Sequence, residues 1–233
     1  MPQTAPFISF RVANPKDLQV IHSLIESAYR GDESRLGWTT EADYLTGNRI
    51  DDSTLLAKIT DPDGAVLLAT AAATTSENER SPTNTETQPP PATQPQKANE
   101  LVLACCEVIR REEARSAYFG LFAVSPRRQG GGIGRAMLAH AEDYCLQRWA
   151  GVNRIYMRVI ASRAELIAWY VRRGYQLRED QFQAFPVEEL KKSGGVALVP
   201  PEELRFAVLE KDLGQFAERK VEATRGKAGT RVF

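Results

Sequence analysis

Cysteine and histidine are scarce in this sequence, and their scarcity excludes two kinds of protein. The 233 residues include three cysteines, of which Cys105 and Cys106 are neighbours in an apolar run, and two histidines, His22 and His140. Three cysteines do not make a disulfide framework, and no cysteine pair has zinc-ligand spacing with the two histidines. We therefore expect buried or half-buried thiols in a reducing compartment, and no metal site.

An excess of charge and a long apolar run are also missing. The 30 Lys and Arg residues balance the 30 Asp and Glu residues, so no global field favours nucleic acid as a partner. No apolar run approaches the roughly 20 residues of a membrane span, and the N-terminus lacks a basic region followed by an apolar core. We therefore expect a cytoplasmic protein without a nucleic-acid or membrane partner.

Hydrophobic periodicity is absent from residues 76–99, which consist largely of Ser, Thr, Asn, Gln, Glu and Pro. Such a composition predicts a disordered insertion. The apolar runs on either side, 65–74 and 101–109, are predicted to be neighbouring strands, so the insertion lies in a hairpin and not between domains. Residues 214–233 are charged and poor in apolar side chains, which predicts a frayed helix or disordered tail after a single domain at 1–213.

The rest of the chain alternates between the periods of strands and helices. Asn14 and Pro15 are the expected N-cap and first-turn proline of one helix, and Gly174 is the expected C-cap of another. Thr40 and Asp43 have the spacing of a capping box. Strands are expected at 7–12, 65–74, 101–109, 117–124, 154–160, from 175 onward and at 204–208, helices at about 15–29, 38–43, 53–59, 132–149 and 164–173, and a polar turn at 31–37. Met137, Leu138, Ala141 and Cys145 share one face of the helix at 132–149.

The stretch 121–138 joins a strand to a helix through a glycine-rich turn. An apolar run of strand formers comes first, Pro126 ends it, and four glycines at 130, 131, 132 and 134 lead into the helix. Such a junction presents unpaired backbone N–H groups and the positive end of a helix dipole to one small volume. The sequence therefore predicts a corner that binds a phosphate or pyrophosphate.

Two common nucleotide-binding loops do not fit this stretch. A dinucleotide fingerprint needs G-x-G-x-x-G, and the glycines at 130–134 lack that spacing as well as an acidic residue ending a strand about 20 residues later. A Walker loop ends in Gly-Lys-Ser or Gly-Lys-Thr, whereas this loop ends in Ile133, Gly134 and Arg135. What remains is the pattern Q-x-x-G-x-G at 129–134.

This pattern, preceded by V-x-P at 124–126, resembles the acetyl-CoA pyrophosphate loop of the GNAT superfamily of acyl-CoA-dependent N-acetyltransferases. A second match follows at 170–175, where Y-x-x-x-G-Y is similar to the family signature at the end of the helix behind the cofactor, with Trp169 where another large residue is common. The two motifs occur in the family's order with a strand between them. The resemblance covers about residues 7–211.

The resemblance implies an α/β (α+β) fold. A GNAT-like single domain is expected, with a mixed, mostly antiparallel central sheet, helices on both faces, and two splayed parallel strands, 117–124 and 154–160, at the cofactor site. The resemblance also implies transfer of an acetyl group from acetyl-CoA, the cosubstrate, to a primary amine by direct attack in a ternary complex, without a metal.

The resemblance assigns the cofactor site to the glycine turn and the strand before it. Backbone N–H groups at 130–135 are expected to bind the pyrophosphate, because glycines allow close approach, and an N–H near Phe122 is expected to stabilise the thioester oxyanion. Many relatives have an asparagine seven residues before the tyrosine; here Arg163 either reaches the cofactor or is a solvated helix start. The implied cofactor-binding residues are Phe122, Ala123, Val124, Gln129, Gly130, Gly131, Gly132, Ile133, Gly134, Arg135 and Arg163.

Proton transfer needs an acid and, for the amine, a base or a desolvating pocket. A CoA thiolate leaves with a pKa near that of a free thiol, about 8.5, and a phenol with a pKa near 10 suits it as a donor. Tyr170 is the candidate general acid, and a packed tyrosine is the structural alternative. The strand 117–124 has no carboxylate, so Glu107 and Glu41 are the candidate bases, each also readable as an ordinary structural glutamate.

The acceptor is expected to lie near Trp38, Glu41 and Tyr44, since this mixture, together with Arg49, suits a polar ligand with an apolar body. The alternative is a tryptophan anchor beside solvated charges. The balanced charge shows no acidic groove for a basic peptide, so the expected partner is a small-molecule amine, bound by a monomer or homodimer. A protein N-terminal or lysine acetyltransferase and a non-catalytic acyl-CoA-binding module are the alternative functions.

Overall fold

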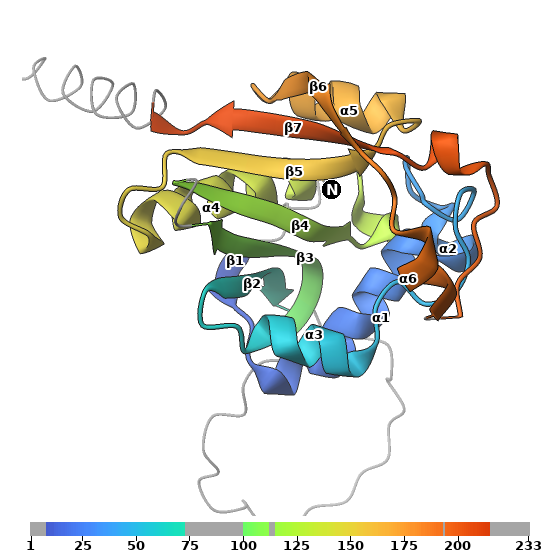
Figure 1. The fold of residues 1–233 in the computed structure, drawn as a ribbon. Helices are drawn as coiled ribbons and strands as arrows, with labels where there is room; N and C mark the ends of the chain where they lie inside the picture. The colour runs from blue at the N-terminus through green and yellow to red at the C-terminus, as the bar shows by residue number, and fades with distance from the viewer. Residues whose placement is uncertain (1–7, 73–99, 112–114, 193, 215–233) are drawn as a thin grey trace, which may run out of the picture.

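The fold is that of a computed structural model, which describes residues 8–72, 100–111, 115–192 and 194–214 (Figure 1). The expected insertion at 76–99 lies outside the described residues. The same holds for the expected C-terminal tail, apart from Gly214.

Seven strands of the described chain form one sheet in the order β1-β2-β3-β4-β5-β7-β6. All neighbours pair antiparallel except β4 and β5, which are parallel. The strands are β1 (Ser9–Val12), β2 (Gly64–Ala72), β3 (Glu100–Arg111), β4 (Ser116–Val124), β5 (Arg154–Ile160), β6 (Gln176–Gln183) and β7 (Phe206–Asp212). The expected mixed, mostly antiparallel sheet is therefore confirmed. Strands β2 and β3 pair from Gly64 with Ile109 to Ala72 with Glu100, so the predicted hairpin partners are neighbours.

Helices cover both faces of the sheet, as expected (Figure 1). They are α1 (Leu18–Tyr29), α2 (Gly31–Ser34), α3 (Asp52–Ile59), α4 (Ile133–Arg148), α5 (Ala164–Val171) and α6 (Val187–Lys192), with the 3-10 turns η1 (Pro15–Asp17), η2 (Pro126–Arg128) and η3 (Pro201–Glu203). Helices α1 and α3 pack on one face through a core that includes Ile21, Ile25 and Leu55. Helix α4 packs on the other face, and α5 joins the same core through Tyr170.

The predicted caps explain where these helices begin. The Asn14 side chain accepts a hydrogen bond from the backbone N–H of Lys16, and Asp17 completes a capping box, so η1 leads directly into α1. The apolar face predicted for α4 is buried against the sheet at Met137, Leu138, Ala141 and Cys145.

All three cysteines are free and buried, as expected. Burial raises the pKa of Cys105 to about 12, and burial, with the nearby Glu142 carboxylate, raises the pKa of Cys145 to about 12.

Four local predictions were wrong. The expected polar turn at 31–37 contains α2, and the expected helix after Trp38 is an irregular loop. In that loop the Thr40 hydroxyl accepts from the backbone N–H of Ala42, while Asp43 pairs with Arg35 and closes no capping box. The last strand begins at Phe206, two residues later than expected, and the consecutive residues from Ala207 to Leu209 are all buried.

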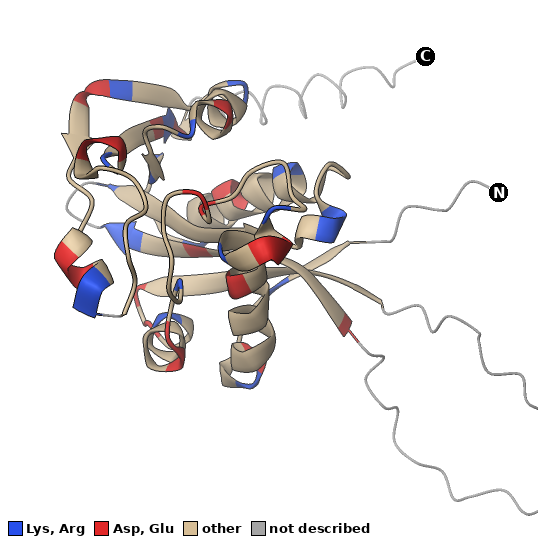
Figure 2. Cartoon of the chain, turned by 90° about the vertical axis from the view of Figure 1, so that its right-hand side faces the viewer, with Lys and Arg blue, Asp and Glu red and all other residues tan. Residues whose placement is uncertain are grey.

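Opposite charges are interspersed over the surface elements (Figure 2). Within the described ranges, no helix is long and apolar enough to cross a membrane. No three His, Cys, Asp or Glu side chains of those residues are grouped to hold a metal ion.

Candidate active site

The parallel strands β4 and β5 separate after their first three residues. They pair only from Ser116 with Arg154 to Tyr118 with Tyr156, although β4 continues to Val124 and β5 to Ile160. A cavity of about 820 Å³ fills the opening. The expected splay of the two strands is therefore present, and it is the origin of the site.

A bulge in β4 shapes one wall of the cavity. Between the pairs Glu107–Gly120 and Cys105–Ala123, two residues of β4 stand opposite one residue of β3. The first of them, Leu121, has φ +49°, a conformation that costs a residue with a side chain on the order of 1–3 kcal/mol. The bulge turns backbone groups near Phe122 out of the regular ladder.

A tyrosine from α1 holds this bulge. The Tyr29 hydroxyl donates a hydrogen bond of 2.9 Å to the Phe122 carbonyl oxygen. Burial is the main cause that raises the pKa of Tyr29 above its usual value, so this phenol stays protonated and keeps donating. Tyr29 lines the cavity, and no local pattern predicts this contact between residues 93 positions apart.

The glycine turn adopts a backbone that other residues resist. Gly130 and Gly132 both have φ +83°, in the left-handed region. Gly132 is the N-cap of α4, and the first intrahelical hydrogen bond runs from Ala136 N to Gly132 O over 3.0 Å. The N–H groups of the first turn therefore have no intrahelical acceptor, no side chain caps them, and no acidic residue lies in that turn. The turn therefore has the geometry and the electrostatics that suit an anion.

Two arginines add positive charge at this end of the cavity. Burial, Arg172 and Arg135 together lower the pKa of Arg173 below its usual value. The Arg173 guanidinium carbon lies 3.5 Å from the centre of the Trp169 ring, and its Nη1 donates to the Trp169 carbonyl over 2.6 Å. Arg135, Arg173 and Trp169 all line the cavity beside the glycines. An anion bound here would relieve the repulsion between the guanidinium groups.

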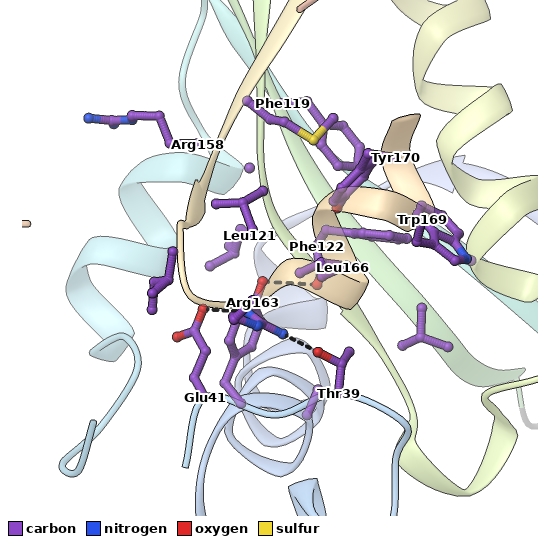
Figure 3. A pocket seen from close by; sticks show the side chains of 18 of the residues that line it. Thr39, Glu41, Phe119, Leu121, Phe122, Arg158, Arg163, Leu166, Trp169 and Tyr170 are labelled. Atoms are coloured by element: carbon purple, nitrogen blue, oxygen red, sulfur yellow. Dashed lines mark hydrogen bonds and ion pairs between the residues drawn. The ribbon is translucent and has the colours of Figure 1, made fainter. Parts of the chain in front are cut away.

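Tyr170 lies in the wall of the cavity, on the α5 side (Figure 3). It is 4% exposed and packs edge-on against Trp169 and Tyr175, and its hydroxyl makes no hydrogen bond within the described residues. Burial raises the pKa of Tyr170 above its usual value. The phenol is therefore protonated at any ordinary pH and available as a donor.

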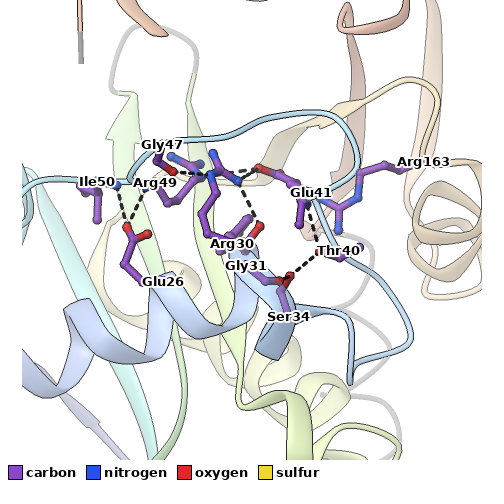
Figure 4. A network of polar contacts seen from close by, with 12 residues as sticks. Glu26, Arg30, Gly31, Ser34, Thr40, Glu41, Gly47, Arg49, Ile50 and Arg163 are labelled. Atoms are coloured by element: carbon purple, nitrogen blue, oxygen red, sulfur yellow. Dashed lines mark hydrogen bonds and ion pairs between the residues drawn. The ribbon is translucent and has the colours of Figure 1, made fainter. Parts of the chain in front are cut away.

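Glu41 lies at the centre of a cluster of arginines (Figure 4). Its Oε2 accepts from Arg30 Nη1 over 3.1 Å, its Oε1 accepts from Arg163 Nη1 over 2.9 Å, and Arg49 Nε lies 3.8 Å away. Burial alone would raise the pKa of Glu41, but the charges of Arg163, Arg49 and Arg30 outweigh it and lower that pKa. A carboxylate with a lowered pKa and both oxygens engaged is a weak base.

Arg163 links the start of α5 to the loop after α2. Besides Glu41, it donates from Nη2 to the Thr39 hydroxyl over 2.8 Å (Figure 3). Its side chain is 10% exposed and lines the cavity, and its Nε is buried without a partner among the described residues. The guanidinium is therefore neither a solvated helix start nor fully satisfied.

The free energy of unfolding is expected to fall at acid pH, because Glu41 becomes protonated there. Because the pKa of this carboxyl is lowered from 4.5 in the folded chain, its contribution to stability is present above that pH and is lost as the pH falls below it. Urea unfolding of wild type and Glu41→Gln between about pH 6 and about pH 3 measures this contribution of the carboxylate to stability. The free energy of unfolding should fall less steeply in Glu41→Gln, and parallel profiles would contradict the assignment.

Trp38 and Gln129 connect the loop after α2 to the glycine turn. The backbone N–H of Trp38 donates to Gln129 Oε1 over 3.0 Å, and Gln129 Nε2 donates to the Val124 carbonyl over 3.2 Å. A Cβ at Gly37 would lie 2.6 Å from Gln129 Oε1, so this close approach depends on glycine. Trp38 is 44% exposed and its ring centre lies 6.4 Å from that of Trp169.

The structure brings most of the predicted site residues together, but not all. Those that line the cavity are Trp38, Glu41, Phe122, Val124, Gln129, Gly130, Gly131, Gly132, Gly134, Arg135, Arg163 and Tyr170. Ala123 and Ile133 are buried in the two cores, and Tyr44 packs in a third cluster with Leu45 and Leu190. Glu107 is 4% exposed on the α3 side of the sheet, where it accepts from Lys58 Nζ over 2.6 Å, and it does not line the cavity.

Sequence reasoning missed part of the lining. Tyr118 and Arg158 lie on the two splayed strands, and Phe206 begins β7 beside them. The available signal was alternation: in a strand, residues two apart point to the same face, so Tyr118 and Gly120 share a side. Which side faces the cavity depends on the long-range pairing of the strands.

Comparison with known proteins places this geometry in a family. The model of the acetyltransferase (GNAT) family matches residues 65–175. No curated protein matches the chain.

Solved structures with the same fold are N-acetyltransferases at low sequence identity. One is the spermidine/spermine N-acetyltransferase SpeG of Vibrio cholerae, solved with manganese ions, with 15% identity and a TM-score of 0.54 over 91% of this chain and 96% of that chain. Another is the ribosomal-protein-S18-alanine N-acetyltransferase of Escherichia coli, with 15% identity and a TM-score of 0.53 over 89% and 94%. A third is nourseothricin acetyltransferase, with 15% identity and a TM-score of 0.52 over 88% and 98%. The family match shows that residues 65–175 form a domain of the acetyltransferase (GNAT) family, and the solved structures share the fold of the chain.

Proposed function

We propose that the chain transfers an acetyl group from acetyl-CoA, the donor typical of the family, to a primary amine of a small molecule by direct attack in a ternary complex. The observation that carries the proposal is one continuous cavity. It joins the glycine turn, which suits a pyrophosphate, to the buried phenol of Tyr170 through the opening between β4 and β5. Both substrates therefore have a place in the same cavity.

The residues at the glycine turn fit the donor. Acetyl-CoA, when bound, supplies a thioester and a pyrophosphate, and the turn offers N–H groups, Arg135 and Arg173 to the latter. A Cβ added at Gly130 or Gly132 would meet no atom within 4 Å, so the space in front of the turn is open. Residues near the bulge at Leu121 present backbone groups where the thioester carbonyl needs a donor. Arg163, with its unpartnered Nε, is a further contact for this substrate.

Gly132→Ala is expected to weaken acetyl-CoA binding by about tenfold or more, because a Cβ strains the left-handed turn and displaces N–H groups from the pyrophosphate. Gly151→Ala is the matched control. Gly151 has φ +85° and also has no atom within 4 Å of an added Cβ, but it does not line the cavity. Calorimetric titration should give equal affinities for wild type and Gly151→Ala. Equal loss of affinity in both variants would assign the effect to global destabilisation.

The cationic lining of the cavity favours the unprotonated form of the acceptor amine. Five arginines and one carboxylate, Glu41, line the cavity among the described residues. Like charges and partial desolvation lower the pKa of an alkylammonium, so the amine binds and attacks in its neutral form. Glu107 faces Lys58 on the far side of β3, and Glu41 is held by its arginines, so neither is placed to abstract the proton directly. We assign Glu41 to holding Arg163 in position.

Two measurements test this function. Calorimetric titration of the full chain with acetyl-CoA should show one site per chain. A thiol-release assay with acetyl-CoA across a panel of primary amines should show amine-dependent release. Binding without release for every amine would favour the acyl-CoA-binding module, and absence of binding would remove the proposal altogether.

A further inference from the structure

The acceptor side of the cavity is the sheet face away from α4. Phe119 of β4 and Met157 and Val159 of β5 belong to the core beneath α4. Side chains alternate along a strand, so Tyr118 and Arg158 point to the opposite face. Figure 3 shows Arg158 and Trp169 on opposite sides of the cavity. Because the glycine turn begins α4, the donor and the acceptor reach the opening from opposite faces.

Two guanidinium groups on this acceptor face make no hydrogen bond to a described carboxylate. The Arg158 guanidinium carbon lies 5.3 Å from the Tyr118 ring centre and 5.7 Å from that of Phe206, and Nη1 lies 3.4 Å from Gln183 Oε1. No described carboxylate lies within 4.0 Å of Arg158. The Arg49 guanidinium carbon lies 4.9 Å from the Tyr29 ring centre, and its Nε is 3.8 Å from Glu41, too far for a hydrogen bond.

The two guanidinium groups face the same cavity as Tyr118. Arg49 lies over the Tyr29 ring and Arg158 over the Tyr118 ring, and all four side chains line the same cavity. The Tyr118 hydroxyl has no hydrogen-bond partner among the described residues, lines the same cavity and adds one more donor. Glu41, the carboxylate of the lining, is already held by Arg30 and Arg163. Among the described residues, this face therefore offers guanidinium and hydroxyl donors to an anion, and its one carboxylate is already paired.

We propose that the acceptor is a primary amine that also carries an anionic group, a carboxylate or a phosphate, and that Arg49, Arg158 and Tyr118 bind this group. The inference rests on the proposed acetyl transfer and names its substrate class. It separates this chain from structural neighbours named for spermidine, since a polyamine would place further positive charge beside Arg49 and Arg158. The product is the acetylated amine with its anionic group unchanged, and the thiol of CoA is released.

Matched acceptors of equal chain length test the substrate class. Each ω-amino acid is compared with its amide, with the diamine and with the aminoalkyl phosphate in the thiol-release assay. The kcat/KM of the anionic acceptors should exceed that of the amide by about tenfold or more, because hydrogen bonds between charged groups are stronger than those to a neutral amide. The diamine should have the lowest kcat/KM. The carboxylate and phosphate arms identify the anionic group. An amide or diamine preferred over both would overturn the inference while leaving the acetyl transfer standing.

Substitutions at Arg158 test whether this residue binds the anionic group of the acceptor. Arg158→Gln should lower kcat/KM for the anionic acceptor about tenfold without changing the Kd for acetyl-CoA, and Arg158→Glu should reverse the preference in favour of the diamine. Arg148→Gln, at the exposed end of α4 and outside the cavity, is the control for loss of one positive charge. Unchanged selectivity in both Arg158 variants, with acetyl-CoA bound normally, would overturn the assignment. No acetyl-CoA binding even in wild type would instead sink the proposed function, and the inference with it.

Discussion

Tyr170→Phe is expected to lower kcat by about 10²- to 10⁴-fold, the range that general acid catalysis contributes. The substitution removes one oxygen from a packed aromatic cluster of Trp169 and Tyr175 and leaves the ring contacts in place. The Kd for acetyl-CoA should change little, because the glycine turn and Arg173 are untouched. Steady-state kinetics and calorimetric titration on the same preparation separate the two quantities.

Tyr144→Phe is the matched control for this prediction. Tyr144 is half-buried on α4, packs edge-on against Trp149 and lies outside the cavity lining, so its hydroxyl should not affect kcat. Since burial raises the pKa of Tyr170, loss of its proton should not limit kcat below about pH 10 in wild type. Unchanged kcat in Tyr170→Phe would remove this tyrosine from the acid role.

Lys211→Met is expected to lower the free energy of unfolding by about 3–5 kcal/mol, the usual effect of breaking a buried ion pair. Lys211 Nζ lies 2.7 Å from Glu142 Oε2, and the Tyr175 hydroxyl donates to Glu142 Oε1 over 3.0 Å. Lys211 and Glu142 are 5% and 9% exposed, so the remaining carboxylate would stay buried with half its partners lost. The loss is large against the roughly 5–15 kcal/mol that stabilises a typical domain.

Urea unfolding with a constant m value measures this loss. Lys191→Met removes an exposed lysine that binds Glu188 over 2.9 Å on α6, and it should change stability far less. The double variant Glu142→Leu with Lys211→Met should recover part of the loss, because neither charge remains unpaired. A change below about 1 kcal/mol in Lys211→Met would contradict the structural role of the pair.

Elements set by local rules were predictable from the sequence. The capping box at Asn14, the left-handed glycine at Gly174 and the apolar face of α4 each depend on residues within one or two turns. Strands β2 to β5 were predicted within two residues of their observed bounds. The glycine turn was predicted from its residues and Tyr170 from the resemblance of 170–175 to the family signature, and both line one cavity.

The side-chain contacts on the acceptor side of the cavity could not be predicted from the sequence, because they join distant parts of the chain. Glu41 meets Arg163 across 122 positions, and the charge of Arg163, with those of Arg49 and Arg30, lowers the pKa of Glu41 and makes it a poor base. Glu107 is one residue from Cys106, which faces α4, yet it points to α3 because side chains alternate along β3. No spacing rule in one sequence gives the face that a strand turns to a cavity.

The cavity between β4 and β5 is lined from both faces of the sheet, and this has a consequence for inhibitor design. The glycine turn lines the cavity on the α4 side of the sheet, and Arg158 and Tyr118 line it on the other side. A bisubstrate compound that joins CoA to an acceptor must thread the space between β4 and β5, where the strands stop pairing at Tyr118 and Tyr156. Its linker should therefore be slender and unbranched, with its bulk and its anionic group placed only beyond the strands.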